Sequence, residues 1–80
     1  IVALAERAKA EVVAALASVT EATLAEPFPI AVAGVTLPTS RFLLHLGTHF
    51  TFHLGQIDYH RRIVTGNAQS AGTLPIAALL

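Results

Sequence analysis

The sequence contains no cysteine, methionine or tryptophan, and only 12% of its 80 residues are charged. Without cysteine the chain can form neither disulfides nor thiolate–metal bonds, and its redox compartment stays undetermined. Five basic and five acidic residues give a formal net charge of zero, which argues against a nucleic-acid surface. No apolar run approaches the ~18 uncharged residues of a membrane span, so we expect no membrane partner. The N-terminus does not resemble a signal peptide, and the cytoplasm is the expected location.

Apolar residues, in contrast, are abundant. They make up 54% of the chain, more than two or three amphipathic helices can bury against one another. Eighty residues also suffice for only one small domain. The chain starts at Ile1 and has no methionine, so we expect residues 1–80 to be one partial domain. Its core would be completed by a missing N-terminal half or by a second copy in a homodimer. The alanine-rich composition is compatible with a bacterium of high GC content.

Residues 2–24 are predicted to be helical, in two pieces. Apolar residues recur at three- and four-residue spacing along one side, at Ala5, Ala8, Val12, Ala15 and Val19. Because this stripe is built of small residues, we expect it to pack closely and antiparallel against the second long helix. Ser18, followed three residues later by Glu21, fits a capping box, so a short second piece should run to Leu24.

Residues 25–39 are predicted to be a crossover between the helices. Pro27 and Pro29 end the preceding helix, because proline disfavours helix in the residue before it. The alternating, β-branched stretch that follows has Ala33-Gly34 at its centre. This pattern predicts a short hairpin or an extended connection.

The second long helix is expected over residues 40–65, with Thr39 or Ser40 as its N-terminal cap. Gly66 suits its C-terminal end. The tail, residues 66–80, has turn residues followed by an apolar stretch that would pack back or meet a partner.

The second helix carries all four histidines of the chain. At 3.6 residues per turn they share an arc of about 80° with one amide: His45, His49, His53, Gln56 and His60. Apolar side chains lie within or beside this arc, so we expect the histidines on a buried face. An unpaired buried polar group costs roughly 1–3 kcal/mol, and a bound metal ion would offset that cost because imidazole is a common metal ligand.

Spacing selects pairs among these histidines. Residues four apart are neighbours on one face, as in the chelating H-E-x-x-H element. Both His45/His49 and His49/His53 satisfy this spacing, whereas His45 and His53 are about 12 Å apart along the axis. One helix therefore supplies two ligands, and a third must come from elsewhere. From spacing alone, metal binding and purely structural histidines both stay open as interpretations.

The segment HFTFHLGQI, residues 49–57, resembles a signature of the DinB/YfiT-like family. That signature reads H-x-x-x-H-x-G-Q followed by a hydrophobic residue and lies near the start of the family's last helix. Residues 16–24, followed by Pro27, resemble the end of its third helix. The likeness covers about residues 4–66.

This resemblance implies an all-α fold, with the chain as the C-terminal half of an up-down-down-up four-helix bundle. In that family three histidines bind a divalent metal at one end of the bundle. Two of them match His49 and His53, and the third lies on the second helix, which this chain lacks. The implied metal is zinc or nickel, with iron as a further candidate. His45, Gln56 and Tyr59 are candidates for shaping the pocket or supporting the ligands.

Characterised relatives suggest transfer of low-molecular-weight thiols, or hydrolysis, as the activity. The fragment alone would lack a complete site. The alternative is a non-enzymatic bundle or dimerisation module with structural histidines. A metal-storage or haem-binding bundle ranks last, because facing carboxylates and a haem-attachment motif are absent.

Overall fold

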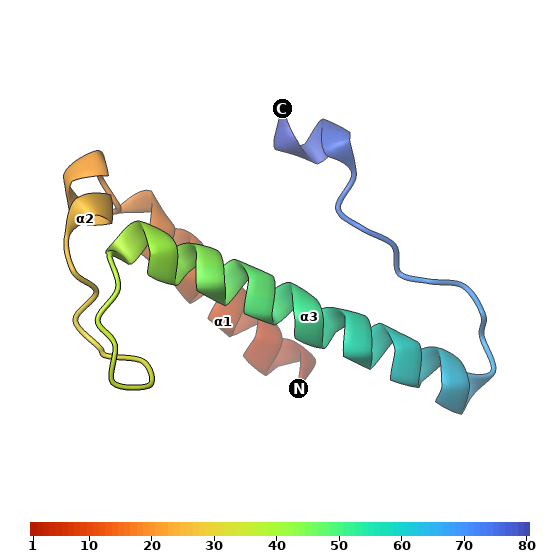
Figure 1. Ribbon diagram of the computed structural model, residues 1–80. Coiled ribbons are helices and arrows are strands. Elements are labelled where there is room, and N and C mark those ends of the chain that lie inside the picture. The colour runs from red at the N-terminus through yellow and green to blue at the C-terminus, as the bar shows by residue number, and fades with distance from the viewer. The chain divides into compact units, whose positions relative to one another are not determined.

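A computed structural model describes all 80 residues of the chain. It contains three α-helices, no strand, and a short 3₁₀-helix near the C-terminus (Figure 1): α1 (Val2–Ala17), α2 (Glu21–Ala25), α3 (Thr39–Thr65) and η1 (Ile76–Leu79). The prediction of an all-α chain is confirmed. The chain consists of two compact units, Ile1–Leu44 and His45–Leu80. No helix has the length and apolar character that a bilayer crossing requires.

The first predicted helical segment is divided at residues 18–20, and its predicted cap is wrong. Ser18 is the C-terminal cap of α1, and its hydroxyl donates to the Ala15 carbonyl at 2.7 Å, so it does not cap the start of the next helix. Thr20 caps α2, because its side-chain oxygen accepts from the Thr23 N–H at 3.2 Å. A serine hydroxyl can serve either helix end, and here the carbonyl three residues earlier takes it.

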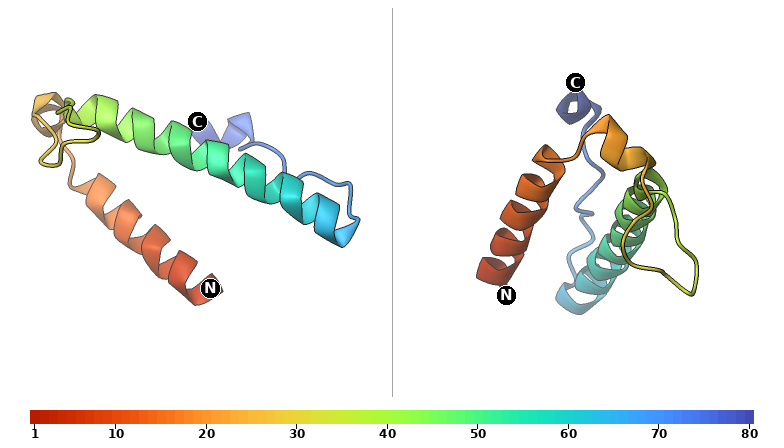
Figure 2. Two further views of the ribbon diagram at one scale, coloured as in Figure 1. Left: turned by 60° about the horizontal axis from the view of Figure 1, so that its bottom comes forward. Right: turned by 90° about the vertical axis from the view of Figure 1, so that its left-hand side faces the viewer.

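The crossover between α2 and α3 is a short hairpin, one of the two predicted forms (Figure 2). Val32 and Val35 exchange two backbone hydrogen bonds, each of 2.9 Å. Between them, Ala33 and Gly34 have φ angles of 51° and 76°, the paired positive values of a type I′ turn. The bridges are isolated and form no strand.

The base of the hairpin is the best-packed part of the first unit. The Phe28 and Phe42 rings stack with centroids 3.8 Å apart and planes 16° apart. Phe42 and Thr39 are the only two buried residues of the chain. Thr39 was predicted, with Ser40, as the cap of α3, but the helix already begins at Thr39. Instead of capping, the Thr39 hydroxyl donates to the Glu26 carbonyl at 2.8 Å.

The C-terminal end of α3 falls at Thr65, as predicted. Gly66 follows with a φ of 68°, the left-handed conformation in which glycine commonly ends a helix. The Thr65 hydroxyl donates to the Arg61 carbonyl at 2.7 Å, which satisfies one of the last carbonyls of the helix.

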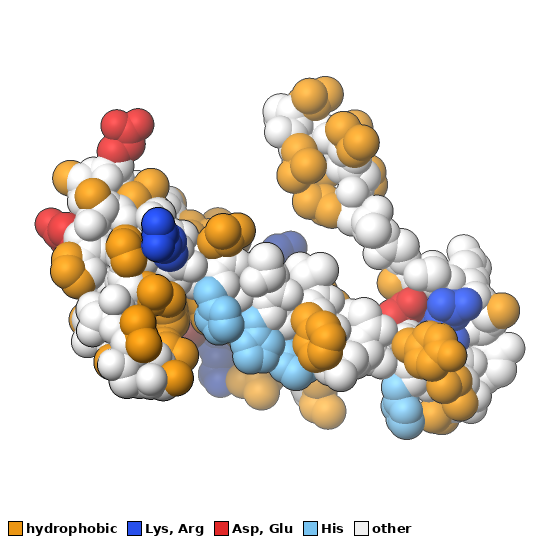
Figure 3. All heavy atoms as spheres, viewed as in Figure 1, with side chains coloured by type: hydrophobic (Ala, Val, Ile, Leu, Met, Phe, Trp, Pro, Cys, Tyr) orange, Lys and Arg blue, Asp and Glu red, His pale blue; other side chains and the backbone are white.

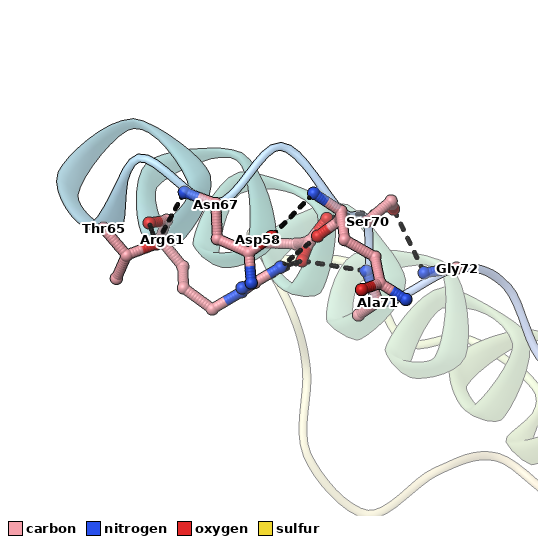
Figure 4. A network of polar contacts seen from close by, with 8 residues as sticks. Asp58, Arg61, Thr65, Asn67, Ser70, Ala71 and Gly72 are labelled. Carbon is pink, nitrogen blue, oxygen red and sulfur yellow. Dashed lines mark hydrogen bonds and ion pairs between the residues drawn. The ribbon is translucent and has the colours of Figure 1, made fainter.

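After this turn the tail binds back onto α3 through polar contacts around Asp58 (Figure 4). The Asp58 carboxylate accepts from the Arg61 guanidinium at 2.9 Å, from the Ser70 hydroxyl at 3.1 Å and from the Ala71 N–H at 3.1 Å. Arg61 also donates to the Gln69 carbonyl at 2.6 Å. The Arg61 hydrogen bond is the main reason that the pKa of Asp58 lies below its ordinary value of 3.8. These contacts fasten residues 69–71 to the helix.

The expectation that the histidine arc of α3 is buried is wrong for this chain. All four histidines are exposed. The apolar side chains among them are also open to solvent, with Phe50 66% and Ile57 64% exposed. The expected partner that would cover this arc stays a prediction.

Candidate metal centre

Three histidines follow one another along the exposed surface of α3. The ring centroids of His45 and His49 are 5.4 Å apart, and those of His49 and His53 are 4.7 Å apart. Figure 3 shows histidine side chains in a row on this surface, with hydrophobic side chains beside them. The row arises because residues four apart in a helix are neighbours on one face.

His49 and His53 form the closest pair. Their Nε2 atoms lie 2.8 Å apart, within hydrogen-bonding distance. The two rings therefore turn the same nitrogen toward a common point, as their four-residue spacing predicts. His45 and His49, by comparison, meet edge to face, with ring planes 69° apart. The structure thus distinguishes between two pairs that spacing alone left equivalent.

The ring of His53 is held on two further sides. Its Nδ1 atom lies 2.8 Å from the Oε1 atom of Gln56, one turn later on the same face. The Phe52 ring meets the His53 ring edge to face, with centroids 5.5 Å apart. Gln56, a candidate for supporting the ligands, is therefore in direct contact with His53.

The other candidates lie beside or outside this cluster. His45 adjoins it through its ring contact with His49. Tyr59 is 64% exposed, and no hydrogen bond joins its hydroxyl to His49, His53 or Gln56. His60 is exposed and lies two turns beyond His53.

The geometry of the pair fits part of a site for a divalent ion. Two nitrogens bound to one tetrahedral zinc at about 2.0–2.1 Å lie roughly 3.3–3.4 Å apart. The two Nε2 atoms, at 2.8 Å, would have to separate by only about half an ångström, a small side-chain rotation. The pair does not make a complete site, because no group of three metal-binding side chains is brought together in the chain.

Sequence patterns missed the contacts around Asp58. At 3.6 residues per turn, Asp58 lies on the side of α3 opposite the histidines. Its partners Ser70 and Ala71 are twelve and thirteen residues away, beyond the reach of helical periodicity. The turn residues Gly66-Asn67 after the helix are the one signal that the tail could fold back.

The chain matches none of the protein-family models, curated proteins or solved structures with which it was compared.

Proposed function

We propose that this chain supplies His49 and His53 as two ligands of a divalent-metal centre in a DinB-like helical bundle. The observation that carries the proposal is the convergence of the two Nε2 atoms to 2.8 Å. The H-x-x-x-H-x-G-Q pattern of residues 49–56 supports it independently. A third histidine, on a helix outside the 80 residues, would complete the ligand set.

The proposed activity is thiol transfer or hydrolysis. A bound zinc, nickel or iron ion would lower the pKa of a thiol or a water molecule and so supply a nucleophile at neutral pH. His49 and His53 would bind the ion as neutral imidazoles, which leaves its full positive charge to stabilise an anionic thiolate or hydroxide.

A non-enzymatic bundle or dimerisation module is the second candidate. It is favoured by the hydrogen bond between His49 and His53, because each ring then has a polar partner without any metal. The exposed apolar side chains of α3, such as Phe50 and Ile57, would in this case pack against a partner helix.

Metal titration of the full-length protein separates these candidates. We expect the wild-type protein to bind zinc or nickel stoichiometrically in isothermal titration, and His53→Ala to lose this binding. His60→Ala is the matched control, because it removes an exposed histidine of the same helix that is remote from the pair. Loss of the metal in His60→Ala with retention in His53→Ala would refute both the site and the DinB-like assignment. No binding by the wild-type protein would favour the non-enzymatic module.

A further inference from the structure

We infer that Gln56 is a positioning residue that fixes His53 in the tautomer with the proton on Nδ1. Nε2 of His53 then carries a lone pair, as a metal ligand must. The hydrogen-bonding part of this inference stands on the geometry alone, and its consequence for metal affinity rests on the proposed function.

The argument starts at the 2.8 Å contact between Nδ1 of His53 and Oε1 of Gln56. An amide oxygen can only accept a hydrogen bond, so Nδ1 must donate. A neutral imidazole carries one N–H, and Nε2 of the same ring is then an acceptor. Gln56 thereby keeps Nε2 of His53, on the far side of the ring, unprotonated.

The direction of the hydrogen bond between His53 and His49 follows from that of the bond to Gln56. Nε2 of His53 lies 2.8 Å from Nε2 of His49, and this hydrogen bond needs one donor and one acceptor. Because His53 Nε2 accepts, His49 Nε2 must donate. The two rings are therefore unlike in the metal-free protein: His53 is already in the binding tautomer, and His49 must first give up its Nε2 proton or move it to Nδ1.

The same contacts fix the orientation of the His53 ring. A half-turn about the Cβ–Cγ bond would exchange Nδ1 with a carbon and move Nε2 away from its present position. Such a turn would break the bonds to Gln56 and to His49 together. Gln56 thus fixes both the orientation of the His53 ring and the nitrogen that carries its proton.

Long-range proton–nitrogen NMR of full-length, metal-free protein labelled with nitrogen-15 histidine tests the inference. At alkaline pH, where neutral imidazole prevails, we expect the His53 spectrum to show a protonated Nδ1 and an unprotonated Nε2. Gln56→Leu should shift His53 toward the opposite tautomer. Gln56→Glu, which keeps an acceptor oxygen, should retain the native tautomer. His60 provides an internal reference whose signals should stay unchanged in both variants.

Two results would overturn the inference. One is a wild-type His53 with its proton on Nε2, which would mean that the amide nitrogen of Gln56 faces the ring and donates. The other is an unchanged His53 tautomer in Gln56→Leu with native helix content by circular dichroism. The wild-type spectrum decides the first point even where Gln56→Leu does not fold.

Zinc titration of the same proteins extends the test to metal affinity. Loss of an outer hydrogen bond to a ligating histidine typically lowers affinity about 10–100-fold. We expect a loss of this size in Gln56→Leu and near-native affinity in Gln56→Glu. If the wild-type protein bound no zinc while the His53 tautomer depended on Gln56, the proposed function would fail and the positioning role would stand. If the protein bound zinc while the tautomer was independent of Gln56, the positioning role would fail and the proposed function would stand.

Discussion

The Glu26 carbonyl oxygen accepts two hydrogen bonds from Thr39, one from the backbone N–H and one from the hydroxyl, each 2.8 Å long. These bonds join the end of α2 to the start of α3 across thirteen residues. Thr39 is only 7% exposed, so water replaces neither bond easily. The crossover is thereby closed at its base, beside the stacked rings of Phe28 and Phe42.

Removing the Thr39 hydroxyl should weaken this closure. Thr39→Val keeps the shape of the side chain and the backbone bond but leaves Glu26 with one donor fewer. We expect the free energy of unfolding to fall by about 1 kcal/mol, the usual net value of a hydrogen bond. Thr39→Ser keeps the hydroxyl and is the matched control. Urea denaturation of the two variants should separate them, and equal stability would contradict a role for the hydroxyl.

Substitutions at the two adjacent residues of the hairpin turn should change the stability of the protein in opposite directions. Gly34→Ala should destabilise the protein by roughly 1–2 kcal/mol, because a φ of 76° is costly for any residue with a Cβ. A new Cβ there would meet no atom within 4 Å, so the cost is conformational. Ala33→Asn should be stabilising, since asparagine tolerates a φ of 51° better than alanine. Thermal denaturation would show both effects, and a lower melting temperature for Ala33→Asn would contradict this account of the turn.

How well the sequence predicted the fold depended on how local each signal is. Ala33-Gly34 and Gly66 adopt the positive φ angles that their positions suggest, so the hairpin and the end of α3 were predictable. The caps were harder, because one hydroxyl has several partners within reach. Ser18 bonds backward to Ala15, and Thr39 bonds to Glu26 across the crossover. The periodicity of the sequence does not indicate which hydrogen-bond partner either hydroxyl takes.

The candidate site was likewise predicted correctly only where the signal is local in the sequence. Four-residue spacing predicted that His49 and His53 would be neighbours, and their Nε2 atoms do converge. It could not distinguish this pair from His45/His49, because the difference lies in side-chain torsions. Burial of the arc was predicted from its apolar neighbours. Those neighbours, including Phe50, are exposed. The prediction failed because burial depends on a second surface, which the sequence of one helix does not describe.

The contacts of Asp58 should depend on pH. Hydrogen bonding to Arg61, Ala71 and Ser70 lowers the pKa of Asp58 below 3.8, so the folded state favours the charged carboxylate. The stabilisation is therefore fully present above 3.8 and is lost as the pH falls through the lower folded-state value. We expect the Ala71 amide proton to change its NMR chemical shift in that acidic range.

Two variants check this assignment. Asp58→Asn should abolish the acid transition of the Ala71 amide, since no group is left to titrate at that position. Arg61→Gln should move the transition to higher pH, because the principal cause of the lowered pKa is removed. An acid transition that persists in Asp58→Asn would show that another carboxylate is responsible.

The uncovered apolar side chains predict that the 80-residue chain associates in isolation. Phe50, Ile57 and Ile63 are each more than 60% exposed on α3, and apolar surface of this kind commonly marks an interaction site. Sedimentation velocity at micromolar concentration should show a species larger than the monomer, and Ile57→Lys should reduce its amount. A compact, well-folded monomer would contradict this prediction.

The choice between the two histidine pairs can be tested directly, because His49 belongs to both. If His49 and His53 hold the metal, His49→Ala and His53→Ala should each lower zinc affinity by more than the roughly 10–100-fold loss typical of a residue that only supports a ligand. His45→Ala should stay within that smaller range, because His45 meets His49 edge to face, whereas the Nε2 atoms of His49 and His53 converge. Isothermal titration of the three full-length variants with zinc and with nickel gives the comparison. A large loss in His45→Ala with little change in His53→Ala would move the site one turn toward the start of α3, and would also separate it from Gln56.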